Sequence, residues 1–257
     1  MPKHRLTVVA GVSGSGKTTL VLESLVPALT AKIADERMPE HVRALDAPGI
    51  ERVTMIDATP IGANVRSTVA TYSGVLDDLR RLFARTEAAK ARGLTAGAFS
   101  YNTGSLRCPT CGGTGQITLD VQFLPDVDID CPDCHGTRYS DEAGEITWEP
   151  KGGHAPVSLP DLLAMTADEA RKVFAGTSQR RLRAKLDTLH ELGIGYMTLG
   201  ESTPALSGGE AQRLKLASEM GRAQEGTLFV FDEPTIGLHP LDVRTLIGVF
   251  QKLIDQG

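Results

Sequence analysis

Residues Leu206–Pro240 read LSGGEAQRLKLASEMGRAQEGTLFVFDEPTIGLHP, and this stretch decides the fold. It begins with a glycine turn formed by Ser207, Gly208 and Gly209, and a helix-forming segment then extends to about Arg222. Free backbone N–H groups and the positive end of the helix dipole favour an anion in front of such a helix, and the serine hydroxyl adds one more donor. The turn therefore predicts a phosphate site, although taken alone it also fits a plain helix cap.

The same stretch continues with a short apolar run and an acidic pair. Leu228–Phe231 carries no charge, which is typical of a parallel strand buried on both faces. Asp232 and Glu233 follow at the carboxyl end of this predicted strand. Ligands bind at that edge of open α/β sheets, and two carboxylates there suit a divalent cation and an activated water. We expect His239, a few residues later, at an interface rather than in catalysis.

A second phosphate-binding motif lies near the N-terminus. Arg5–Ala10 is predicted to form a strand, and GVSGSGKT follows at residues 11–18, before a helix-forming TLVLE. This order matches the P-loop pattern, in which backbone N–H groups surround the phosphates, the lysine reaches the β- and γ-phosphates and the threonine hydroxyl ligates Mg²⁺. The alternative is a glycine turn with an incidental lysine. The residues expected to bind ATP are Gly11, Ser13, Gly14, Ser15, Gly16, Lys17, Thr18 and Thr19.

Length and charge set the outer limits. With 257 residues the chain is long enough for one large domain or two ordinary ones, and its net charge of −5 does not by itself indicate nucleic-acid binding. No apolar run approaches the roughly 18 residues needed to span a bilayer, and the N-terminus lacks the pattern of a signal peptide. We therefore expect no membrane partner and a cytoplasmic location.

The four cysteines form two CxxC pairs that predict a metal site. Nineteen residues separate the pairs, and four thiolates at this spacing suit tetrahedral Zn²⁺. Residues 116–123 alternate in polarity and predict a strand of a hairpin held by the metal. A redox dithiol is one alternative, and His135 as a competing ligand is another. The predicted zinc ligands are Cys108, Cys111, Cys131 and Cys134.

Between about Leu76 and Gly200 helical periodicity replaces the strand pattern. Leucines recur at helical spacing in residues 76–83 and 182–189, and Gly193 fits the end of the second helix. Thr166 and Glu169 have the spacing of a capping box that opens another helix. These segments predict a mainly helical insertion into the α/β core.

One basic cluster in the insertion raises the question of DNA binding. Residues 76–200 contain 14 Lys and Arg against 17 Asp and Glu, so the insertion has no overall positive field. A solvated helix face is the favoured interpretation of the cluster, and a DNA contact is the alternative. Its members are Arg180, Arg181, Arg183 and Lys185.

Several ordered motifs together resemble the UvrA family, the damage-sensing ATP-binding-cassette (ABC) proteins of bacterial nucleotide excision repair. They are GVSGSGKTTL, IDATPIG, ATYSGVLDDLRRLFA, the cysteine segment, GYMTLGESTPALSGGEAQRLKLASE and FDEPTIGLH, and they span almost the whole chain. The resemblance implies an α/β fold: an ABC-type P-loop nucleotide-binding domain interrupted by a mainly helical insertion that carries a zinc hairpin. The expected parts are residues 1–75 and 201–257 for the ATP-binding core and 76–200 for the insertion, with a zinc module at 104–140.

The resemblance also implies a function and its partners. The chain is expected to be part of an ATP-hydrolysing, zinc-containing DNA-damage recognition subunit that acts on damaged double-stranded DNA, with a UvrB-like repair partner. Lys17, Asp232 and Glu233 would be catalytic, and Thr18 with Asp232 would hold Mg²⁺. The signature turn at Ser207 would clamp the γ-phosphate of ATP bound by a second ATPase half or by a second copy of the chain. The resemblance further implies a fragment or a truncated gene product.

Two departures from the family pattern favour a paralogue. The family usually has glutamine where this chain has Ala58, and residues 63–74 read ANVRSTVATYSG in place of an RTPRSNPATYTG-like segment. In cassette ATPases that glutamine senses Mg²⁺ and the attacking water. The alternative function is therefore a catalytically weak nucleotide-binding interaction module, or a drug-tolerance paralogue of the same family.

Overall fold

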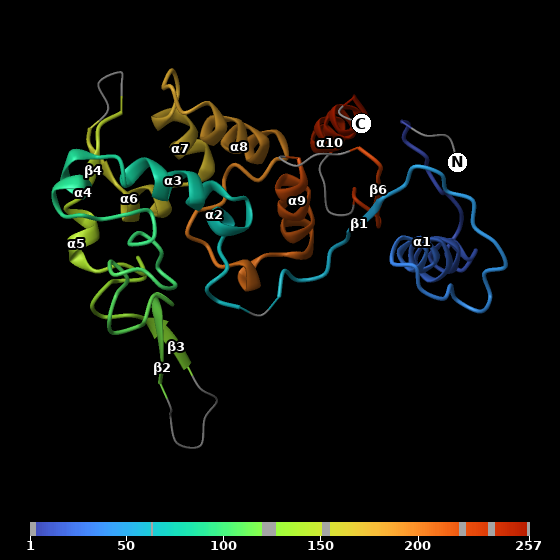
Figure 1. Ribbon diagram of the computed structural model, residues 1–257, viewed down its shortest axis with the longest axis horizontal. Coiled ribbons are helices and arrows are strands. Elements are labelled where there is room, and N and C mark those ends of the chain that lie inside the picture. Colours follow the sequence, from blue (N-terminus) through green and yellow to red (C-terminus); the bar gives the residue numbers. More distant parts are fainter. Residues whose placement is uncertain are drawn as a thin grey trace. The chain divides into compact units, whose positions relative to one another are not determined.

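The computed structural model describes residues 4–62, 64–119, 127–150, 155–220, 225–235 and 240–255 (Figure 1). The chain divides into two compact units, one made of residues 1–58 and 220–257 and the other of residues 59–219. In the described part of the chain, no helix is both long enough and apolar enough to cross a membrane. His239, Arg222 and the residues from Asp120 to Phe123 lie outside the described residues.

The first unit contains a parallel pair of strands. Strands β1 (Arg52–Ile56) and β6 (Thr227–Phe231) pair along their length, with Ile56 opposite Phe231. β-Branched and aromatic residues dominate both segments and favour the extended backbone. The strand predicted at Leu228–Phe231 and its parallel direction are confirmed, but of its residues only Val230 is buried.

Helices complete the first unit. A π-helical segment, η1 (Thr19–Leu25), follows the glycine loop and continues into α1 (Val26–Ile33). α10 (Pro240–Asp255) buries an apolar face, and Phe250 on that face lies against Phe231 with 4.5 Å between ring centroids. The helix predicted after the loop is therefore present, although it begins with π-helical geometry.

The strand predicted at residues 5–10 is wrong. These residues form no strand in the structure, and the side chains of Leu6 and Val8 are 49% and 75% exposed. A strand needs a neighbour that accepts and donates its ladder hydrogen bonds. In the described part of this unit β1 pairs with β6, and the apolar segment before the glycine loop is left outside the ladder.

The core of the second unit consists of packed helices. α3 (Val75–Phe83) contacts α2 (Val69–Tyr72), α6 (Leu159–Ala164) and α8 (Arg180–Glu191). The leucines predicted to face the core of α3 and α8 are buried, and Gly193 follows the end of α8 in a left-handed conformation. The helical periodicity read from the sequence is thus confirmed.

Shorter elements complete this unit. The capping box predicted at Thr166 and Glu169 is present at the start of α7 (Ala167–Val173), and a similar box joins Ser158 to Asp161 at the start of α6. The signature helix α9 begins at Gly208 and ends at Glu219. The remaining elements are α4 (Glu87–Ala91), α5 (Asp141–Gly144), η2 (Thr203–Ala205), β2 (Gln116–Leu119), β3 (Val127–Asp130), β4 (Thr147–Trp148) and β5 (Val157–Ser158).

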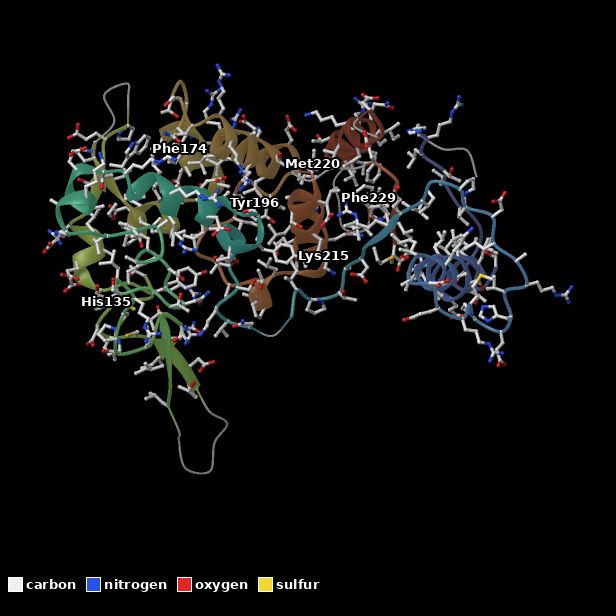
Figure 2. All side chains as sticks on the ribbon, in the orientation of Figure 1. His135, Phe174, Tyr196, Lys215, Met220 and Phe229 are labelled. Carbon is white, nitrogen blue, oxygen red and sulfur yellow. The ribbon has the colours of Figure 1, made fainter. Side chains whose placement is uncertain are left out.

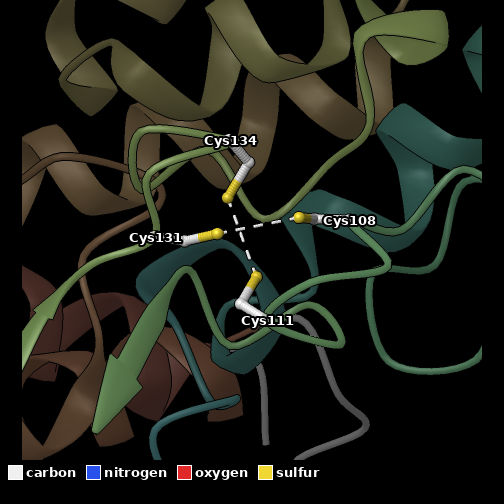
Figure 3. A group of neighbouring side chains, drawn as sticks. All are labelled: Cys108, Cys111, Cys131 and Cys134. Atoms are coloured by element: carbon white, nitrogen blue, oxygen red, sulfur yellow. Dashed lines mark hydrogen bonds between the residues drawn. The ribbon is translucent and has the colours of Figure 1, made fainter. Parts of the chain in front are cut away.

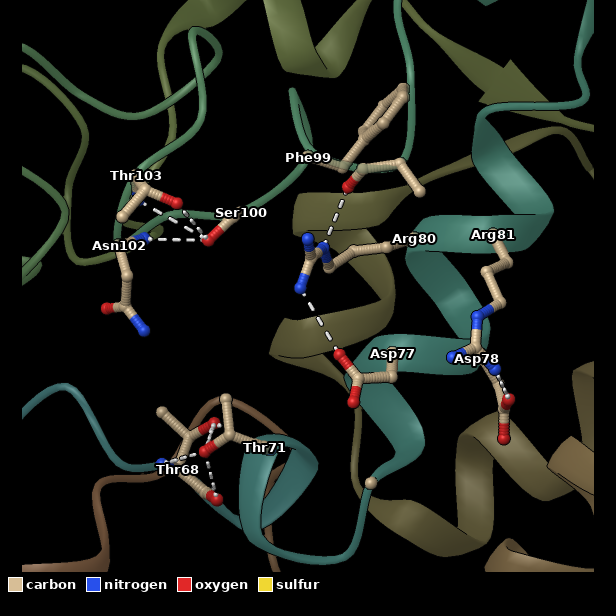
Figure 4. Close-up of polar contacts among 12 residues, drawn as sticks. Thr68, Thr71, Asp77, Asp78, Arg80, Arg81, Phe99, Ser100, Asn102 and Thr103 are labelled. Atoms are coloured by element: carbon tan, nitrogen blue, oxygen red, sulfur yellow. Dashed lines mark hydrogen bonds and ion pairs between the residues drawn. The ribbon is translucent and has the colours of Figure 1, made fainter.

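Two members of the basic cluster on α8, Lys185 and Arg181, contact a carboxylate of the same unit. Lys185 Nζ lies 2.6 Å from the Asp78 carboxylate of α3 and donates to the Gly74 carbonyl at 2.5 Å. Arg181 lies 3.6 Å from the same carboxylate, and Arg81 of α3 also donates to it (Figure 4). The Asp78 side chain is only 10% exposed. The interpretation as a freely solvated face is therefore wrong for Lys185, because a buried carboxylate needs cationic partners.

Candidate metal centre and nucleotide-binding elements

The four cysteine sulfurs form a compact cluster within the second unit. All four Sγ atoms lie within 4.8 Å of one another, with 3.8 Å between Cys108 and Cys131 and 3.7 Å between Cys111 and Cys134 (Figure 3). A Zn–S bond of about 2.3 Å in tetrahedral geometry requires sulfurs about 3.8 Å apart. The donor set and its spacing therefore fit a structural Zn²⁺ ion. None of the four cysteines is in a disulfide.

Backbone hydrogen bonds shape the two knuckles that present these sulfurs. Gly115 N donates to Cys111 Sγ at 3.3 Å, and the Gly115 carbonyl accepts a hydrogen bond from Cys131 N at 2.9 Å. The second bond connects the two knuckles directly. Strands β2 and β3 leave from this base as an antiparallel pair, and Ile117 of β2 packs against the cysteine cluster. The predicted hairpin is confirmed for its described residues, and the role of a metal in holding its base stays a prediction.

The thiols differ in acidity for local reasons. Burial raises the pKa of Cys108 and raises that of Cys134 to about 12. Burial also acts to raise the pKa of Cys111, but hydrogen bonds from the Gly115 and Gly113 N–H groups outweigh it and lower this pKa to about 7. Metal ligation needs thiolates, so binding of Zn²⁺ would release protons from the more basic thiols. His135 is exposed and does not belong to the cluster.

Two partly buried contacts that the sequence patterns did not indicate tie this module to residues 64–68. Arg66 Nη1 donates to the Gly112 carbonyl of the first knuckle at 2.7 Å. Arg138, which follows the second knuckle, is buried, lies over the Tyr101 ring and donates to the Val65 carbonyl at 3.1 Å. Such long-range partners have no local signal in a sequence. They connect the metal module to the segment that follows β1.

A shallow hollow of about 270 Å³ adjoins this segment. Its lining offers amide, hydroxyl and guanidinium donors, which suit an anion. The residues that line it are Asn64, Arg66, Ser67, Thr71, Tyr72 and Asn102.

The predicted P-loop lies in the first unit. The Lys17 ammonium folds back on the loop and donates to the carbonyls of Gly11 and Val12, at 2.8 and 2.9 Å. Ser15 N donates to the Val12 carbonyl and closes the turn. The remaining predicted ATP ligands in this loop, from Ser13 to Thr19, are exposed. Their role in binding stays a prediction.

The acidic pair emerges from the carboxyl end of β6, as expected. Asp232 N donates to the Ile56 carbonyl at 3.2 Å and extends the parallel ladder by one bond. Glu233 is exposed and has a φ of 45°, an uncommon conformation for a residue with a side chain. Ala58 follows β1 by two residues, so it lies beyond the same edge of the two-stranded sheet. Coordination of Mg²⁺ by Thr18 and Asp232 stays a prediction.

The signature turn lies in the second unit and holds a carboxylate. Ser207 N and Ser207 Oγ both donate to Glu210 Oε2 at 2.8 Å, which closes a capping box at the start of α9. The Tyr196 hydroxyl donates to Glu210 Oε1 at 2.5 Å. The S-x-x-E spacing indicates the capping box from sequence alone, whereas the tyrosine contact depends on the fold. The role of Ser207, Gly208 and Gly209 in phosphate binding stays a prediction.

Comparison with known proteins places these elements in a family. No family model matches the chain. UvrABC system protein A of Bacillus subtilis is 44% identical over 259 residues, which cover 100% of this chain and 26% of that protein. UvrABC system protein A of Lactiplantibacillus plantarum is also 44% identical, with the same coverage. The chain belongs to the UvrA family.

A solved structure agrees with this membership. The crystal structure of UvrA2 from Deinococcus radiodurans matches with a TM-score of 0.79 and 46% identity, covering 95% of this chain and 29% of that one. The chain therefore spans about a quarter of the length of the UvrA relatives that it matches. The resemblance read from the ordered motifs is confirmed, and so is the mixed α/β fold.

Proposed function

We propose that this chain is the ATP-binding and zinc-binding part of a DNA-damage recognition subunit of nucleotide excision repair. The observation that carries the proposal is the tetrahedral spacing of four thiols in a chain 44% identical, over its whole length, to UvrABC system protein A. In this function Cys108, Cys111, Cys131 and Cys134 hold one Zn²⁺ ion. Because all four positions are protein ligands, the ion stabilises the module and performs no catalysis.

The proposed ATP site is an ABC-type P-loop site in the first unit. Lys17 and the backbone N–H groups of Gly14–Thr18 bind the β- and γ-phosphates, while Thr18 and Asp232 hold Mg²⁺, which neutralises phosphate charge. Glu233 orients the attacking water and accepts its proton. Two features support this arrangement: the Lys17 ammonium is already held at the loop, and the acidic pair follows β6.

The proposed site needs a second ATPase unit. In ABC proteins the P-loop of one unit and the signature turn of another meet around one nucleotide. Ser207, Gly208 and Gly209 therefore serve ATP held by a counterpart half or by a second copy of this chain. Hydrolysis to ADP and phosphate is expected only in that assembly.

Damaged duplex DNA and a UvrB-like protein are the proposed partners. Support for a nucleic-acid contact comes from the hollow beside Arg66, whose donors suit a phosphate of the backbone. The α8 cations support it less, because Lys185 and Arg181 are engaged with Asp78.

A second candidate function rests on one residue. Ala58 lies beyond the sheet edge that carries Asp232, and its methyl group cannot hydrogen-bond Mg²⁺-bound or attacking water. This favours a catalytically weak nucleotide-binding module, or a drug-tolerance paralogue, over an efficient ATPase.

Single-turnover hydrolysis of MgATP separates the two candidates. The chain is assayed alone and joined to its counterpart half, each with and without damaged duplex. Hydrolysis that Glu233→Gln abolishes supports the enzyme, and tight binding without turnover supports the module. If the chain has no magnesium-dependent affinity for ATP, or if Lys17→Ala does not remove that affinity, both candidate functions are overturned.

A further inference from the structure

Two of the donors that the signature turn offers to a phosphate, both on Ser207, are already taken. The Ser207 N–H and the Ser207 hydroxyl each carry one hydrogen, and both hydrogens point to Glu210 Oε2 at 2.8 Å. A phosphate oxygen that accepts a hydrogen bond from Ser207 must therefore replace the carboxylate as the acceptor. The two anions also repel each other at such short range.

Tyr196 holds the other oxygen of the same carboxylate. Its hydroxyl donates to Glu210 Oε1 at 2.5 Å, and its side chain, beside α9, is 58% exposed (Figure 2). The backbone on either side of Tyr196 is fixed, because the carbonyls of its two neighbours accept hydrogen bonds from Asp168 N and Ala167 N at 2.8 and 2.9 Å. A rigid loop thus presents the hydroxyl that keeps the carboxylate over Ser207.

An ordinary helix cap does not need this extra contact. At α7, Thr166 N and Oγ1 donate to Glu169 Oε2 at 2.8 and 2.9 Å, which are nearly the same bonds as at α9. Glu210 accepts those bonds and the tyrosine hydroxyl as well. Burial raises the pKa of Glu210, but the hydrogen bonds from Tyr196 and Ser207 lower it overall, so the carboxylate keeps its charge at neutral pH.

We propose that Tyr196 and Glu210 form a latch that occupies the two Ser207 donors of the signature turn and must open before Ser207 binds a phosphate. The latch rests on the proposed function of Ser207 as a phosphate ligand. Glu210 is the occupant and Tyr196 is a positioning residue that retains it. Weakening either one should therefore increase the affinity of the turn for phosphate, whereas a purely structural cap would only lose stability.

The test follows backbone amides by NMR in the ¹⁵N-labelled, zinc-loaded chain. Inorganic phosphate is titrated into the wild type, Glu210→Gln, Tyr196→Phe and the matched control Glu169→Gln. Glu210→Gln keeps an acceptor oxygen but removes the charge. At Ser207–Gly209 the half-saturating phosphate concentration should fall at least about fivefold in Glu210→Gln and about twofold in Tyr196→Phe. It should not change in Glu169→Gln.

The outcomes separate the latch from the wider function. The latch is overturned if Glu210→Gln and the wild type bind phosphate at this turn with equal affinity. It is also overturned if phosphate shifts these amides in none of the variants. If the phosphate affinity increases in Glu210→Gln but not in Tyr196→Phe, Tyr196 is not part of the latch. A parallel titration with MgATP follows the amide signals of Gly14–Thr18. If these signals do not shift, the proposed nucleotide site is refuted, and the latch is still decided by the phosphate titration at Ser207.

Discussion

Replacement of Gly113 by alanine should loosen the zinc module without removing a ligand. Gly113 lies in the first knuckle with a φ of 83°. A Cβ atom there would overlap the carbonyl oxygen of Tyr101 and lie 2.8 Å from its carbon, closer than the 3.0 Å that real Cβ atoms keep. Both contacts are with backbone, which cannot rotate away as a flexible side chain does.

The cost of the substitution has two parts. Positive φ costs an alanine about 1 kcal/mol, and forcing apart well-packed backbone costs about 1–3 kcal/mol more. Tyr101 resists the shift, because it is fully buried and its hydroxyl donates to the Arg66 carbonyl at 3.0 Å. Gly93→Ala is the matched control: its φ is 66°, but nothing lies within 4 Å of the added atom. The control should therefore lose only about 1 kcal/mol.

Two measurements test the predicted effect of Gly113→Ala. Thermal unfolding should show a midpoint about 5–12 °C lower for Gly113→Ala and about 2–4 °C lower for Gly93→Ala. Competition with a chromogenic chelator should release zinc several-fold faster from Gly113→Ala only, because ligand distances tolerate shifts of about 0.2 Å. Equal melting temperatures and equal zinc release in the two variants would refute the packing account of the first knuckle.

Three further predictions follow from named contacts. Cys131→Ser should lower the zinc content of purified protein from one ion per chain to well below one by elemental analysis; an unchanged content would contradict tetrahedral ligation by four thiolates. Lys185→Met should destabilise the fold by about 2 kcal/mol in denaturant titrations, because the Asp78 carboxylate is 10% exposed and loses its 2.6 Å partner. Tyr101→Phe should cost about 1–2 kcal/mol in the same assay, since the Arg66 carbonyl loses a buried donor. No change in unfolding midpoint would contradict either of these two.

The four-cysteine cluster was predictable because its information is local. Each CxxC pair brings two sulfurs together within one turn of backbone, and only one long-range fact, the meeting of the two knuckles, remained for the fold to supply. The signature capping box was predictable for the same reason, because Ser207 and Glu210 are three residues apart. Helices α3 and α8 followed from periodicity, which encodes the buried face directly.

Two predictions were wrong, the strand at residues 5–10 and the solvated face at Lys185. Both failed because tertiary partners, and not local propensities, decide the structure there. Residues 5–10 have the composition of a strand, but a strand also requires a neighbouring ladder, and the structure pairs β1 with β6. Lys185 belongs to a segment whose composition is typical of a solvated helix, but Asp78, more than 100 residues away in the chain, lies beside it.

The sequence by itself determined the motifs, the metal donor set and the family resemblance, since each depends on residue types at fixed short spacings. Only the tertiary structure decided which residues join these motifs to one another. Arg66 reaches the Gly112 carbonyl, Arg138 reaches Val65, and Tyr196 reaches Glu210. These contacts join residues between 14 and 73 positions apart. Their energies depend on burial and direction in the folded chain, and neither is written in local sequence.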